Sequence, residues 1–191
     1  AMTHAIEAYT NRWPHPDTAF YAISAVRMIF ANLPRAFAHG EDLEARESMA
    51  VAANYAGLAF TKAYVGYVHA FSHQIGGMYG VPHGQANAIL LPYVLDFLKD
   101  APHARRRLAD LAVAIGAGSP SEPQDLLAQR FVDRVRELNR AIGIPDKLEA
   151  LKAPDIGEIA RAAMVEAHRD YPVPKNMSLG EAEALMQMCR A

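Results

Sequence analysis

Three of the eight histidines in this chain lie within the 15 residues from His69 to His83. His69 and His73 are four residues apart, so a helix would project both imidazoles from one face. Residues that interrupt helices precede the third histidine, at Gly76, Gly77, Gly80 and Pro82. They predict that the helix breaks and the chain turns back, which would return His83 to the side of the first two rings.

This pattern favours a metal site. A lone histidine on an apolar helix is usually an ordinary core or surface residue. Neutral imidazole, however, is a common ligand for borderline divalent metals, and a site needs ligands that converge from separated positions. A turn between two histidine-bearing segments supplies this convergence.

Two stretches carry a resemblance to a known family. The run GYVHAFSHQIGGMYGVPHGQANAILLP, from Gly66 to Pro92, closely resembles the metal-binding signature of the iron-containing (group III) alcohol dehydrogenases. The opening THAIEAYTNRWPHPDTAFYAISAVRMI, from Thr3 to Ile29, is similar to the same family. The likeness spans essentially the whole chain and is strongest over residues 1–30 and 54–95.

The resemblance implies roles for four histidines. His4, His69 and His83 match the family's metal-binding histidines, with Fe²⁺ or Zn²⁺ as the ion. His73 matches a histidine near the nicotinamide and substrate, which implies a catalytic part in proton transfer. A role in orienting neighbouring groups stays open for His73. His15, His103 and His168 receive no role.

The resemblance also implies a fold and an activity. The fold expected is all-α, a dehydroquinate-synthase-like bundle of about seven to nine helices. The activity is interconversion of a small alcohol and its aldehyde or ketone, by hydride transfer to NAD(P) beside the metal. Because the family holds NAD(P) in an N-terminal α/β half, we expect this chain to bind the dinucleotide poorly and to be inactive alone.

The family's fourth metal ligand is an aspartate four residues before its first histidine. Counted back from His4, that aspartate would precede Ala1, so we expect the chain to lack it together with the nucleotide-binding half. Metal affinity should then be reduced, because the anionic ligand is missing. Two origins of the opening Ala-Met are compatible with the sequence: it is either an expression scar or native sequence.

Composition narrows the class of protein. The chain has 191 residues, of which 51% are hydrophobic, and this is enough for one substantial core. We therefore expect one helical metal-binding domain over residues 1–191. The 19 basic and 21 acidic residues nearly balance, which favours neither nucleic acid nor membrane as a partner. A single cysteine, Cys189, suits the cytoplasm, and no apolar run is long enough to cross a bilayer.

Periodicity predicts helices through most of the chain and no strand. Pro14 and Pro16 predict a loop, after which Asp17 is expected to cap the second helix. Pro92 is expected to kink or break a buried helix. The expected helices cover residues 1–10, 17–37, 41–64, the histidine segment after Gly66, the run after Gly84, and 102–115, 124–141, 155–168 and 179–190. No Gly-x-Gly-x-x-Gly fingerprint follows a strand.

Two other functions are compatible with the histidines. One is a helical metallohydrolase that activates water at a three-histidine site, although no His-Asp or His-Glu-x-x-His motif supports it. The other is a non-catalytic oligomerisation module. An apolar face left by an absent partner domain would also predict self-association, most simply as a homodimer.

Overall fold

The computed structural model describes residues 1–13 and 15–191, so Pro14, one of the two prolines of the predicted loop, lies outside the described residues. Over that part of the chain there are nine α-helices and one 3-10 helix. Their bounds are α1 Met2–Thr10, α2 Pro16–Ala38, α3 Leu43–Ala63, α4 Tyr67–Tyr79, α5 His83–Leu98, α6 Pro102–Ala114, α7 Gln124–Ala141, η1 Ala153–Asp155, α8 Ile156–Asp170 and α9 Leu179–Cys189. Pairing of extended backbone in these residues is limited to an isolated bridge between Leu148 and Arg190. The all-α prediction is confirmed.

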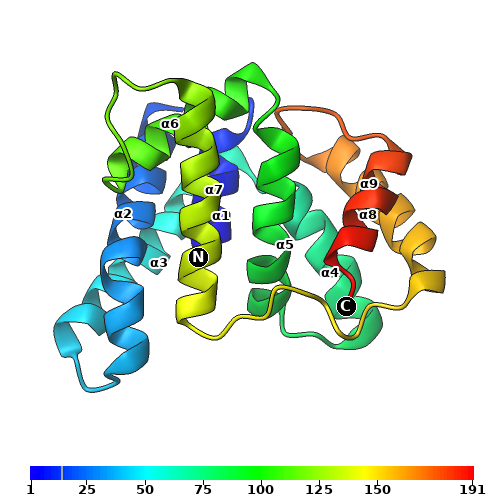
Figure 1. Cartoon of the computed structure of the whole chain (residues 1–191), viewed down its shortest axis with the longest axis horizontal. Helices are drawn as coiled ribbons and strands as arrows, with labels where there is room; N and C mark the ends of the chain where they lie inside the picture. Colours follow the sequence, from blue (N-terminus) through cyan, green and yellow to red (C-terminus); the bar gives the residue numbers. More distant parts are fainter. Residues whose placement is uncertain (14) are drawn as a thin grey trace.

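Helix α1 is central in the bundle and largely buried. It packs against α2, α3, α5 and α6, and seven of its nine residues are buried. Figure 1 shows α2 and α3 on one side of it and α4, α8 and α9 on the other. Helices α5 and α7 lie between these two groups. A short helix buried on nearly every side can hold functional groups rigidly, because most of its rotamers are fixed by packing.

The predicted boundaries of two helices were wrong. Helix α2 is capped by His15 and starts at Pro16, so Asp17 lies in the first turn; a proline fits there because its missing N–H would be unpaired anyway. Helix α4 runs through Gly76 and Gly77 and ends only at Gly80, whose φ of 68° is left-handed. Packing of α4 against α5 and α8 outweighs the low helix propensity of the two inner glycines.

The segment after α4 also differs from the expectation. Helix α5 begins at His83 itself and continues through Pro92 to Leu98, so this proline does not end the helix. By contrast, the apolar stripe predicted for residues 124–141 is confirmed, since Leu127, Phe131 and Val135 are buried on one face of α7. Long periodic segments were therefore predicted more accurately than their ends.

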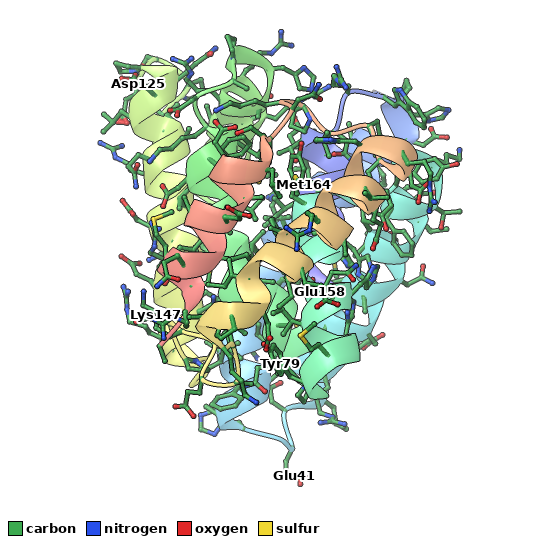
Figure 2. The ribbon with its side chains drawn as sticks, turned by 90° about the vertical axis from the view of Figure 1, so that its right-hand side faces the viewer. Glu41, Tyr79, Asp125, Lys147, Glu158 and Met164 are labelled. Carbon is green, nitrogen blue, oxygen red and sulfur yellow. The ribbon has the colours of Figure 1, made fainter. Side chains whose placement is uncertain are left out.

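Two segments at the same end of the bundle differ in how they are held (Figure 2). The turn between α2 and α3 extends away from the other helices (Figure 1), and Glu41 lies at its tip (Figure 2). The end of α4 is instead tied to the chain before α8, because the Tyr79 hydroxyl donates to Asp155 at 2.5 Å. Among the described residues, no helix combines the length and the apolar character needed to cross a bilayer.

The single cysteine provides a test of this packing. Cys189 is fully buried at the end of α9, and burial raises the pKa of its thiol to about 12. Because the thiolate is the nucleophile, alkylation by iodoacetamide at pH 8 should be about 1,000-fold slower in the folded protein than in urea. Comparing the two labelling rates by mass spectrometry checks this, and rates within tenfold of each other would contradict it.

Candidate metal centre

Three helices bring the histidines together. Helix α1 carries His4 and Glu7 on one face, α4 carries His69 and His73, and α5 opens with His83. The Nε2 atoms of His4 and His69 are 3.1 Å apart. The rings of His69 and His83 are 5.3 Å apart between centroids. Residues 65 positions apart in the chain therefore share one site.

His73 lies at the exposed side of the cluster. Its ring stacks on His83 at 5.4 Å with an interplanar angle of 16°, and it is 5.9 Å from the His69 ring. The side chain is 43% exposed, whereas that of His69 is 2% exposed. Nδ1 of His73 contacts Glu166 at 2.7 Å, and the same carboxylate accepts from Gln74 and Tyr171. His73 therefore presents its other nitrogen toward solvent and the cluster.

Burial favours the neutral form of His4 and, to the extent that it is covered, of His83. It lowers the pKa of His4 to about 3, and the nearby His69 lowers it further in the same direction. Burial likewise lowers the pKa of His83, again with His69 as the next cause. Since a metal binds the neutral imidazole, both rings are in the binding form at neutral pH.

Glu7 and Asn87 were not predicted as site residues. Glu7 is 2% exposed and contacts Nδ1 of His69 at 2.6 Å. The Asn87 amide nitrogen lies 2.9 Å from Nε2 of His83 and 3.4 Å from Nε2 of His69. Each stands one helical turn from a predicted ligand, three residues after His4 and four after His83. That spacing was the available signal, and reasoning confined to histidines passed over it.

The spacing of His4 and His69 fits a divalent metal. Two imidazole nitrogens bound to one ion at about 2.1 Å lie about 3.0 Å apart at an octahedral angle and about 3.4 Å apart at a tetrahedral one. The observed 3.1 Å between His4 and His69 falls in this range. The buried Oδ1 of Asn87 also has no hydrogen-bond partner beside these rings. Imidazoles of this kind suit Fe²⁺ or Zn²⁺.

The match between prediction and structure is partial. The four predicted histidines are brought together, but residues 1–13 and 15–191 contain no group of three or more His, Cys, Asp or Glu side chains arranged to hold a metal ion. His103 and His168 lie elsewhere and contact the Asn11 carbonyl and the Tyr67 hydroxyl. The ligand set His4, His69 and His83 thus stays a prediction.

The connector before α4 depends on a glycine. A Cβ on Gly66 would lie 2.9 Å from Oε1 of Glu7, which is closer than real Cβ atoms approach. Gly66→Ala should therefore displace the carboxylate and lower the free energy of unfolding by about 1–3 kcal/mol, as overpacking does. Urea denaturation measures this change.

Gly57→Ala is the matched control, because a Cβ there meets nothing within 4 Å in α3. That substitution should stabilise by about 0.5–1 kcal/mol, since alanine favours a helix interior. Equal effects of the two substitutions would contradict the proposed close approach at Gly66.

Comparisons with known proteins place the chain in a family. Residues 1–189 match the Fe-containing alcohol dehydrogenase family, C-terminal. Alcohol dehydrogenase 4 of Saccharomyces cerevisiae is 39% identical over 91% of this chain and 44% of its own length. The 1,3-propanediol dehydrogenase of Citrobacter freundii is 40% identical over 88% of this chain and 43% of its own length.

A solved structure supports the same assignment. The crystal structure of a 1,3-propanediol oxidoreductase superposes with a TM-score of 0.91 and 36% identity, over 98% of this chain and 49% of that one. The chain therefore spans less than half the length of the curated relatives it matches. It belongs to the Fe-containing alcohol dehydrogenase family and corresponds to the C-terminal domain of that family.

Proposed function

We propose that this chain is the metal-binding half of an alcohol dehydrogenase that uses Fe²⁺ or Zn²⁺ and NAD(P), with His4, His69 and His83 as the metal ligands. The observation that carries the proposal is the convergence of His4 and His69 from α1 and α4, with Nε2 atoms 3.1 Å apart, beside the His83 ring. When bound, the metal would act as a Lewis acid on the alcohol or carbonyl oxygen while NAD(P) accepts or returns a hydride.

The chain's own residues would position the metal ligands and transfer the proton. The buried α1 and α4 hold His4 and His69 in place, and the apolar neighbours of these rings exclude water. His73 is the catalytic candidate. Because Glu166 accepts only, Nδ1 of His73 donates to it, and Nε2 is left to hydrogen-bond to the substrate or exchange a proton with it.

A small cavity lies beside His73, although none of the three proposed metal ligands lines it. It measures about 270 Å³ and is lined by residues of α4 and α8, namely His73, Gln74, Gly77, Met78, Glu158, Ile159 and Ala162. Small alcohols and aldehydes fit the smaller end of ligand sites. We expect NAD(P) to contact mainly a separate nucleotide-binding domain, so the isolated chain should not turn over alcohol.

Metal titration tests the site. The chain, stripped with a chelator, should bind one equivalent of Zn²⁺, and of Fe²⁺ under anaerobic conditions, by equilibrium dialysis and elemental analysis. Absence of binding at about 1 mM metal would overturn the proposed ligand set. A panel of ester and phosphate substrates should show no hydrolysis by the zinc-loaded chain, and hydrolysis would revive the metallohydrolase hypothesis.

A chimaera tests the activity. The chain replaces the matching C-terminal part of the Citrobacter freundii relative and should restore alcohol-dependent reduction of NAD(P). The same chimaera with His73→Ala should lose activity while keeping its metal. A metal-loaded but inactive chimaera would instead favour the non-catalytic oligomerisation module.

We also propose that the chain forms a homodimer. Trp13 and Tyr64 form an edge-on pair at 5.4 Å and are 56% and 47% exposed, which is apolar area that a dimer would bury. Sedimentation of the isolated chain should show a homodimer, and a monomer at high concentration would contradict it.

A cytoplasmic location is likewise proposed, with localisation of a tagged chain as its test.

A further inference from the structure

Glu7 is the buried charge closest to the proposed ligands. We infer that Glu7 is a positioning residue, whose carboxylate fixes both the orientation and the tautomer of His69 and joins the helix that carries His69 to the helix that carries His4. The inference rests on the proposed function, in that His69 is taken as a metal ligand. It concerns the polar groups behind the ring rather than the metal itself.

The carboxylate has three donors around it. Oε2 accepts from the Gly66 amide at 2.8 Å and contacts Nδ1 of His69 at 2.6 Å, and Oε1 accepts from the Val68 amide at 2.7 Å. Glu7 is 2% exposed, so water does not solvate it. A buried carboxylate is costly unless charged or polar donors replace water, and these three contacts do so. The three contacts therefore fix the position of the Glu7 side chain.

Two of these donors lie at the start of α4, namely the amide of its cap residue Gly66 and the amide of Val68, the second residue of the helix. The cap residue of that helix is Gly66, which has no side chain to accept them. The amides at a helix start lack partners within the helix, and a negative charge there is favoured by the helix dipole. Glu7 thus caps α4 from a different helix. The first turn of α4, which contains His69, is fixed relative to α1.

The third contact sets the state of the ring. A carboxylate only accepts, so Nδ1 of His69 carries the hydrogen, and in the neutral ring Nε2 keeps its lone pair. That Nε2 is the atom 3.1 Å from Nε2 of His4. Since His4 and Glu7 are three residues apart on α1, one short helix places both the partner nitrogen and the group that aims His69 toward it.

The tautomer in the metal-free wild-type protein is the first test. Proton–nitrogen correlation spectra at pH 8 should show His69 with its hydrogen on Nδ1. A spectrum with the hydrogen on Nε2 would overturn the inference. This measurement needs no metal, so it still tests Glu7 if the chain binds none, whereas absence of metal binding would count against the proposed function alone.

Substitution is the second test. Glu7→Gln keeps the size of the side chain but removes the charge, and its amide cannot satisfy all three donors. Zinc affinity should fall about 10- to 100-fold, as it does when a group behind a ligand is removed. The His69 ring should also become a mixture of tautomers. Wild-type affinity together with an unchanged tautomer would contradict the inference.

Glu166→Gln is the matched control, because Glu166 contacts His73 rather than a proposed metal ligand. It should leave zinc affinity within about threefold of wild type, well below the effect expected at Glu7. An equal loss in both variants would overturn the specific role of Glu7. If Glu7→Gln fails to fold by circular dichroism, Glu7→Asp serves instead. Asp retains the charge but is one methylene shorter. Glu7→Asp should therefore retain the His69 tautomer and lose less zinc affinity than the loss of about 10- to 100-fold expected for Glu7→Gln.

Discussion

Replacing His69 with alanine is expected to lower zinc affinity more than about 100-fold, which exceeds the usual loss for a residue behind a ligand. The reason is geometric. His69 is the buried ring that lies next to both His4 and His83, so its loss removes the centre of the cluster. His4→Ala and His83→Ala should each weaken binding as well. Isothermal titration of the stripped variants measures the three effects.

A histidine outside the cluster provides the control. His39 is exposed at the end of α2, where its backbone caps the helix. His39→Ala should leave zinc affinity within about twofold of wild type, because it removes no nitrogen near the site. If His69→Ala and His39→Ala bind zinc equally, the ion is held elsewhere and the ligand set proposed above is wrong.

The largest loss of stability is expected from Phe71→Ala. Phe71 is 0% exposed and lies in α4 between the turns that carry His69 and His73. Truncating a fully buried phenylalanine removes apolar burial and leaves a cavity, at a cost of about 3–5 kcal/mol. Since a domain is usually stable by only about 5–15 kcal/mol, this is a large fraction of the total. Urea denaturation followed by circular dichroism measures it.

Val165→Ala is the comparison for Phe71→Ala. Val165 is 64% exposed on α8, which packs against α4. Its truncation should change the free energy of unfolding by less than about 0.5 kcal/mol. A small effect of Phe71→Ala, close to that of Val165→Ala, would mean that α4 is not anchored in the core as the structure indicates.

The fold was predictable where the apolar pattern repeats over many residues. The stripe of α7 and the separation of the helices by proline-containing connectors needed only local information. The errors arose where tertiary contacts oppose local propensity. Gly76 and Gly77 stay helical because α4 packs on α5 and α8, and a sequence pattern does not contain that packing.

The site was predictable to a similar degree. Residue type and spacing indicated His69, His73 and His83. The family resemblance added His4, which lies 65 residues before His69. Glu7 gave a weaker signal. An acidic residue on a short helix is ordinarily exposed, and only the burial of α1 on nearly all sides makes it a functional candidate. That burial depends on four other helices at once.

The three-residue connector 64–66 between α3 and α4 is hydrogen-bonded to Glu7 of α1 and to Asn11, the residue that follows α1. Asn11 donates to the carbonyls of Ala63 and Val65, and Glu7 accepts from Gly66. Tyr64 is held at a φ of 61°, a conformation that nonglycine residues adopt only when neighbours impose it. A tag, split point or insertion in this connector should therefore disturb the proposed metal site through Glu7. The projecting turn at Glu41 is expected to tolerate such changes better, because it extends away from the other helices.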